Sequence, residues 1–161
     1  MERVLNFFAK LGCTGLFLFC LTGNLEAQLK DSTLKNSIES RRFVFYVQTV
    51  MPMKGGSRHV TSGYELKVSP DTIVSYLPYY GRAYSAGYGG SDAGGYDFTS
   101  KKFNYSAKPG KKGGWEINIK PTDVQNGPEF DLSVSSDGYA TLRANSSSRQ
   151  PISYRGYIAH K

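Results

Sequence analysis

The side chains with the clearest chemistry gather in the segment Tyr76–Arg82, which reads Tyr-Leu-Pro-Tyr-Tyr-Gly-Arg. Pro78 cannot continue a strand ladder and Gly81 permits a turn, so Arg82 is expected at the base of a loop with tyrosines beside it. A guanidinium can bind a carboxylate or phosphate through two hydrogen bonds, and tyrosine rings can stack on a ligand. Two interpretations stay open: a core-and-turn segment, or an arginine-tyrosine cluster that faces a ligand.

The loop that follows, residues 81–96, interleaves tyrosine with glycine. It lacks the Gly-Lys-Ser/Thr ending of a phosphate-binding loop and no helical pattern follows it, which argues against a nucleotide site. A tyrosine-rich lip over a cavity fits this composition better, because such surfaces bind by stacking. With two later residues, this region supplies the predicted ligand-binding set: Tyr79, Tyr80, Arg82, Tyr84, Tyr88, Arg149 and Tyr154.

Catalytic motifs are missing from the sequence. Of the two histidines, His59 follows a turn-like Gly-Gly-Ser-Arg and His160 is the penultimate residue, and no Gly-x-Ser-x-Gly elbow accompanies them. Six carboxylates could supply a glycosidase pair, although several fall on the solvated faces of their strands: Glu65, Asp71, Asp97, Glu116, Glu129 and Asp131. We therefore predict a non-enzymatic protein with no metal or other cofactor, and keep a carboxylate-based hydrolase as a third alternative.

The N-terminus predicts export. Arg3 and Lys10 precede an apolar stretch, residues 11–21, and Ala27 offers a small residue at a cleavage point. The stretch is shorter than the roughly 20 residues that span a bilayer, and cleavage removes both cysteines. The predicted organisation is a signal peptide over residues 1–27, a linker with a short helix over 28–41, and a single β domain over 42–161.

The rest of the chain reads as strands and turns. Four runs alternate apolar and polar residues, as strands with one buried face do; their apolar positions are Tyr64, Leu66 and Val68, then Trp115, Ile117 and Ile119, then Phe130, Leu132 and Val134, then Ile152, Tyr154, Gly156 and Ile158. Two further segments, Phe43–Val50 and Thr72–Leu77, are apolar on both faces and predict strands covered on both sides.

Turn and cap signals complete the predicted fold. Asp137-Gly138 predicts a hairpin. Leu34 and Ile38, four residues apart, predict a short helix that Asp31 or Ser32 could cap. We expect an all-β protein: an antiparallel meander of about eight strands that forms a barrel or a sandwich, with this short helix at its N-terminal end.

The net charge of +7 favours an anionic partner, and export argues against nucleic acid. We therefore predict a soluble periplasmic or surface module that binds an anionic or amphipathic envelope ligand, in the barrel or at its mouth. The alternatives are an accessory protein that contacts another envelope protein through a sheet edge or a tyrosine-rich face, and a generic soluble surface.

The segment Leu77–Ala83, Leu-Pro-Tyr-Tyr-Gly-Arg-Ala, resembles the central signature of an uncharacterised secreted family of Bacteroidetes, domain-of-unknown-function family four-two-five-one (DUF4251). Other matching stretches are Phe43–Phe45, Asp71–Val74, Gly138–Leu142 and Arg149–Gly156, so that the resemblance spans roughly residues 41–158. It implies a periplasmic or surface location and supplies no activity, substrate or catalytic residue.

Two smaller hypotheses follow. Arg82 and Arg149 both lie beside chain-turning residues and are expected near one end of the barrel, where they could bind one anion together. Asp71-Thr72-Ile73 resembles the Asp-Ser/Thr-aliphatic acceptor for O-glycosylation in such bacteria.

Overall fold

The computed structural model describes residues 32–61, 63–82, 84 and 94–160. The chain divides into two compact units, residues 1–33 and 34–161, and the second contains the whole described sheet. The predicted signal peptide, its cleavage point and Tyr88 lie outside the described residues. Within the described ranges, no helix has the length and apolar character needed to cross a membrane.

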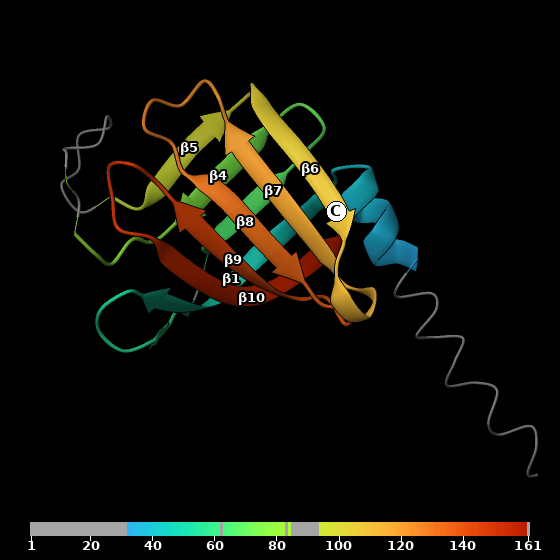
Figure 1. The fold of residues 1–161 in the computed structure, drawn as a ribbon, viewed down its shortest axis with the longest axis horizontal. Coiled ribbons are helices and arrows are strands. Elements are labelled where there is room, and N and C mark those ends of the chain that lie inside the picture. Colours follow the sequence, from blue (N-terminus) through green and yellow to red (C-terminus); the bar gives the residue numbers. More distant parts are fainter. Residues whose placement is uncertain (1–31, 62, 83, 85–93, 161) are drawn as a thin grey trace, which may run out of the picture. The chain divides into compact units, whose positions relative to one another are not determined.

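Ten strands in the described part of the chain form one antiparallel sheet, two more than predicted (Figure 1). Their order is β5-β4-β3-β1-β10-β9-β8-β7-β6, and β2 pairs with β1 off this path. The strands are β1 (Phe43–Pro52), β2 (Arg58–His59), β3 (Glu65–Val68), β4 (Ile73–Leu77), β5 (Tyr96–Ser100), β6 (Phe103–Pro109), β7 (Trp115–Pro121), β8 (Glu129–Val134), β9 (Tyr139–Asn145) and β10 (Ile152–His160). A 3-10 turn, η1 (Lys111–Gly113), precedes β7.

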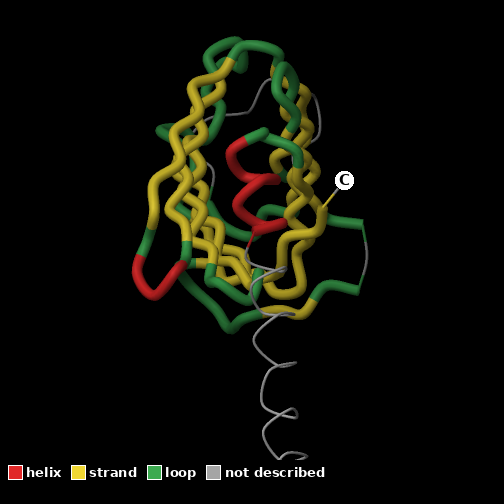
Figure 2. Tube along the Cα trace, turned by 90° about the vertical axis from the view of Figure 1, so that its right-hand side faces the viewer, coloured by secondary structure: helices red, strands yellow, loops and turns green. Residues whose placement is uncertain are grey.

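The sheet curls into a nearly closed barrel. Its two end strands, β5 and β6, follow one another in the chain, and each pairs with a single neighbour. Figure 2 shows the strands as two facing walls, with the helical residues 34–39 between them. The predicted all-β class with a short N-terminal helix is confirmed, and the structure selects the barrel over the sandwich.

The predicted alternation places the core inside this barrel. Inward positions of the alternating strands are buried, among them Leu66, Val68, Ile117, Ile119, Phe130, Leu132, Val134, Ile152, Tyr154 and Ile158. Leu34 and Ile38 of the helix, 2% and 0% exposed, join the same apolar cluster. The Tyr105 hydroxyl on β6 donates a hydrogen bond of 2.8 Å to the Ile38 carbonyl. Since burying one such aliphatic side chain contributes about 1.5–3 kcal/mol, the helix is an integral part of the core.

A β-bulge in β1 corrects one expectation. The register with β10 shifts between Val47 and Thr49, which leaves Gln48 as the extra residue. Val47 and Val50 are both buried although they are three residues apart. The change of phase explains why Val50 is buried. In the first half of the run the expectation of a strand covered on both sides holds at Val44, which faces outward and is 4% exposed, while Tyr46 on the same face is half-buried.

The expectation that Thr72–Leu77 is covered on both sides is wrong. Ile73 and Leu77 point into the core, while Val74 and Tyr76 on the other face are 37% and 48% exposed. This segment is an ordinary alternating strand whose outer residues happen to be apolar or aromatic.

β1 and β10 approach each other closely at Gly156, where an added Cβ would overlap the Tyr46 carbonyl oxygen. We expect Gly156→Ala to lower the free energy of unfolding by about 1–3 kcal/mol, because two paired backbones must move apart. Urea denaturation measures the change. Gly56→Ala is the matched control, since nothing lies within 4 Å of its added atom. Equal midpoints for both variants would contradict the close approach.

One carboxylate holds the corner between β5 and β6. Asp123 accepts hydrogen bonds from the Ser100 hydroxyl at 2.5 Å and from the backbone N–H groups of Lys101 and Lys102 at 2.8 and 3.1 Å. These bonds, that of Ser100 foremost, lower the pKa of the Asp123 carboxyl. The turn that joins the two end strands of the barrel is thus fastened by an ionised side chain.

Because this pKa is lower in the folded chain than in the unfolded one, the Asp123 carboxylate stabilises the fold above the ordinary aspartate pKa of about 3.9. That contribution disappears as the pH falls through the folded-state value. We expect Asp123→Asn to lower the free energy of unfolding at neutral pH, with a gap from the parent that shrinks below about pH 4. Urea titrations across pH measure the gap. Asp71→Asn, which changes an exposed carboxyl, is the control. If the difference in the free energy of unfolding between Asp123→Asn and the parent did not change with pH, the stabilisation would not come from the ionised carboxylate.

Candidate functional site

Several predicted ligand residues converge where β4 ends and β10 begins. The Arg149 guanidinium lies over the rings of Tyr79 and Tyr96, 5.0 and 5.3 Å from their centroids. Its Nη1 donates hydrogen bonds to the carbonyl oxygens of Gly94 at 2.7 Å and Gly95 at 3.3 Å. Ring contacts and charge-assisted hydrogen bonds together fasten the chain before β5 to the chain before β10.

The tyrosine hydroxyls of this cluster also bond to the backbone. The Tyr79 hydroxyl donates to the Arg82 carbonyl at 2.8 Å and lies 3.2 Å from the Gln150 carbonyl oxygen. The fully buried Tyr154 donates to the Pro78 carbonyl at 2.8 Å. Burial raises the pKa of both hydroxyls, so both remain protonated donors at neutral pH.

Other predicted residues lie around this cluster. The Arg58 guanidinium lies 4.7 Å from the centroid of the Tyr80 ring. Arg82 is exposed, and Tyr84 is 68% exposed. The backbone of Arg82 adjoins Gln150, the neighbour of Arg149, through a hydrogen bond of 3.1 Å. Ligand binding by these residues stays a prediction, and the bonds of Arg149 and Tyr154 give both a structural task.

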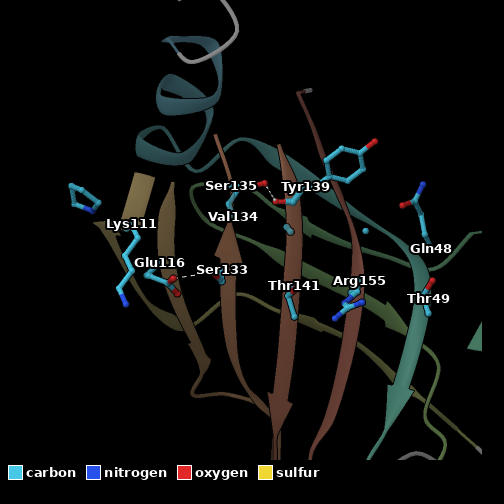
Figure 3. A pocket seen from close by; sticks show the side chains of 14 residues that line it. Gln48, Thr49, Lys111, Glu116, Ser133, Val134, Ser135, Tyr139, Thr141 and Arg155 are labelled. Carbon is cyan, nitrogen blue, oxygen red and sulfur yellow. Dashed lines mark hydrogen bonds between the residues drawn. The ribbon is translucent and has the colours of Figure 1, made fainter. Parts of the chain in front are cut away.

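An open groove with a volume of about 1010 Å³ lies on the outer face of the sheet, over β7, β8, β9, β10 and β1 (Figure 3). Lys111 of η1 lies at one end of it, and Gln48, the bulged residue of β1, at the other. Between them the groove is lined by outward-facing side chains: Thr49, Glu116, Ser133, Tyr139, Thr141 and Arg155.

Five of these side chains form one row across the sheet. Strand register places Glu116 opposite Ser133, and Ser133 opposite Thr141. It then places Thr141 opposite Arg155, and Arg155 opposite Thr49. Figure 3 shows them side by side on successive strands. We call Glu116, Ser133, Thr141, Arg155 and Thr49 the polar row.

The two ends of the polar row are hydrogen-bonded, whereas the side chain of Arg155, the neighbour of Thr49 in the row, is not hydrogen-bonded to any described residue. The Ser133 hydroxyl donates to Glu116 at 2.8 Å, and Thr49 Oγ1 lies 3.2 Å from His59 Nδ1. The exposed Arg155 side chain makes no hydrogen bond or ion pair with any residue that the structure describes. Its guanidinium therefore offers a full set of donors for a carboxylate or phosphate.

Of the six carboxylates that sequence reasoning considered for hydrolysis, Glu116 lines the groove, and Glu129 and Asp131 lie on β8 outside it. The Asn118 amide donates to both Glu129 and Asp131 at 2.8 Å, and Lys120 lies 3.7 Å from Glu129. These contacts form a network of polar side chains on the surface of β7 and β8. In the described ranges, no group of three or more His, Cys, Asp or Glu residues could hold a metal ion.

Sequence reasoning placed Glu116 and Arg155 on solvated strand faces without placing them together. Period-two alternation shows which face a side chain occupies. It does not show which residue of the next strand lies opposite, because that depends on the hydrogen-bonded register. No local motif could have revealed the polar row, since each member comes from a different strand.

The contacts of Arg149 make a structural prediction. Arg149→Gln removes the contacts of the guanidinium with two tyrosine rings. The shorter, uncharged glutamine side chain also replaces the guanidinium that donates hydrogen bonds to the carbonyl oxygens of Gly94 and Gly95. We expect the free energy of unfolding to fall by about 1–3 kcal/mol, measured by urea denaturation, because partly buried acceptors lose a charged donor. Arg82→Gln, which changes an exposed arginine, should cost less than about 0.5 kcal/mol. Similar losses from both variants would mean that Arg149 has no special fastening role.

The chain can now be compared with known proteins. Among solved structures, a DUF4251 family protein from Bacteroides eggerthii DSM 20697 is similar, with 16% identity and a TM-score of 0.58 over 82% of this chain and 88% of that one. At this identity the likeness shows the fold alone. No curated protein matches the chain. The model of DUF4251, a domain of unknown function, matches residues 25–158 and confirms the resemblance seen in the sequence. The chain therefore belongs to the DUF4251 family.

Proposed function

We propose that this protein is an exported, non-enzymatic module of the bacterial envelope that binds an anionic ligand in the groove over β7–β10 and β1. Export is supported by the basic residues and apolar stretch at the N-terminus, and by the small residue Ala27 at the expected cleavage point. The net charge of +7 supports an anionic partner.

The proposal rests mainly on the position and contacts of Arg155. This residue lines the open groove between Thr141 and Thr49, and its guanidinium makes no hydrogen bond or ion pair with any residue that the structure describes. Hydroxyl side chains, Thr141 and Thr49, lie opposite it on the neighbouring strands. A cation surrounded by neutral hydrogen-bonding groups can hold an anionic group and its polar neighbours together.

The outer groove is better supported than the barrel interior. The interior is filled by an apolar cluster that includes Phe45, Phe130 and Tyr154, which are 0% exposed. At the mouth, Arg149 already serves backbone carbonyls. The mouth residues Arg82 and Tyr84, which are exposed, remain a second candidate position for the ligand.

A different function, contact with another envelope protein, is supported by the end strands. β5 and β6 each pair with a single neighbour in the sheet, so each presents backbone groups that an added strand could use. Crosslinking of the protein in intact cells, followed by identification of the attached peptides, would reveal such a partner at these strands.

The first experiment is native mass spectrometry of the mature protein, purified gently from the envelope of the bacterium that makes it. We expect an additional mass that is lost on denaturation. In Arg155→Ala the fraction of protein that carries this mass, its occupancy, should fall, because loss of a charge-assisted hydrogen bond of roughly 1.5–3 kcal/mol weakens binding about tenfold or more. The starting residue of the same sample tests the expected N-terminus at Gln28.

Variants of two other arginines accompany Arg155→Ala, one as a control and one as a test of the second candidate position. Arg42→Ala removes an exposed arginine that does not line the groove, and should leave the occupancy unchanged. Arg82→Ala tests the mouth instead. Loss of the additional mass in Arg82→Ala and not in Arg155→Ala would move the site to the mouth. The bare polypeptide mass in every sample would refute the binding function.

A further inference from the structure

A second row of side chains runs beside the polar row. Strand register places Tyr139 of β9 opposite Tyr157 of β10, and Tyr157 opposite Tyr46 of β1. Tyr139 and Tyr157 are 61% and 40% exposed, and Tyr46 is half-buried. The rings of Tyr46 and Tyr157 lie 5.5 Å apart between centroids, with 34° between their planes. We call Tyr139, Tyr157 and Tyr46 the tyrosine row.

The two rows belong to one surface. On β9 and β10 their members are two residues apart, Tyr139 with Thr141 and Tyr157 with Arg155, so they share the outer face at a spacing of about 7 Å. On β1 the bulge at Gln48 keeps Tyr46 and Thr49 on that same face. Tyr139 lines the groove together with Arg155, and Figure 3 shows both side chains.

The direction of these rows favours an elongated ligand. Both rows run across the strands, and the polar row extends over five neighbouring strands. At about 4.8 Å between strands, it is roughly 19 Å long. A ligand that used every member would be a chain of several units lying perpendicular to the strands.

The chemistry of the rows favours sugar units. A sugar ring presents an apolar face of C–H groups, which can stack on tyrosine, and a rim of hydroxyls, which can pair with Ser133, Thr141 and Glu116. A peptide that adds to a sheet needs free backbone groups at an edge, and these strands are paired on both sides. A lipid chain needs an apolar pocket, whereas this groove is open and crossed by charged and hydroxyl groups.

We propose that the ligand of the groove is an acidic glycan chain, which lies across the strands with its ring faces on the tyrosine row and its hydroxyl and acidic groups on the polar row. The proposal rests on the proposed function and specifies its ligand. Arg155 would hold a carboxylate or an ester sulfate of the chain, and Lys111 would face a second acidic group along it.

The test is calorimetric titration of the mature protein with defined polysaccharides. Polygalacturonate supplies carboxylates, dextran sulfate supplies ester sulfates, and dextran is the neutral chain. We expect at least one acidic chain to bind about tenfold or more tightly than dextran, and monomeric galacturonate to bind far more weakly than the polymer. Comparison of the two acidic chains identifies the acidic group. Binding of phosphatidylglycerol vesicles in preference to every polysaccharide would overturn the proposal.

Matched variants separate the two rows. Arg155→Gln should weaken the acidic chain about tenfold and leave dextran unchanged. Tyr157→Ala should weaken both kinds of chain about three- to tenfold, whereas Tyr157→Phe, which keeps the ring, should bind as the parent does. Tyr76→Ala and Arg42→Gln are the controls, because both change exposed residues outside the two rows. Thermal unfolding followed by circular dichroism verifies that each variant is folded.

The outcomes distinguish this proposal from the proposed function. If the native protein carries a ligand that depends on Arg155 but contains no sugar repeat, the glycan is wrong and the binding function stands. If Arg155→Gln and Tyr157→Ala bind every polysaccharide as the controls do, the surface defined by the two rows is not a glycan site.

Discussion

The structure depends on the β-bulge at Gln48, which shifts the inward and outward alternation of side chains along β1. β1 pairs with β10 along its length and with β3 and β2 at its two ends, so it joins the two halves of the barrel. One extra residue at Gln48 lets Val47 and Val50 both enter the core. Without the bulge, one half of β1 would point its apolar side chains into water, because a strand alternates with a period of two.

The same constraint shapes the outer surface. By absorbing a residue, the bulge brings Tyr46 and Thr49 to one face and continues both rows of side chains from β10 onto β1. Gly156 helps from the other side, since the absence of a side chain lets the two backbones lie close. A packed interior and a continuous outer surface therefore have one structural origin.

Sequence reasoning succeeded where the signal was local. The helix around Leu34 and Ile38, the hairpin at Asp137-Gly138 and the inward positions of β7, β8 and β10 all follow from spacing and turn chemistry, and the structure has them. It failed at Thr72–Leu77, where apolar residues on the outer face suggested a covering layer that is not there. An apolar side chain in a strand can be buried or exposed, and only the neighbours that pack against it decide which.

The arginine-tyrosine segment shows the same division. The chain order alone identified Arg82, Arg149 and their tyrosines as unusual, and the fold does bring Arg149 onto Tyr79, though through contacts that fasten the backbone. Arg155 drew no attention as one polar residue of an alternating strand, yet register aligns it with side chains from four other strands. The sequence by itself determined the all-β class, the core positions and the basic charge, because these depend on local periodicity and composition. Tertiary structure alone decided the barrel, the bulge and the two rows, because hydrogen-bonded register between distant strands is a property of no single segment.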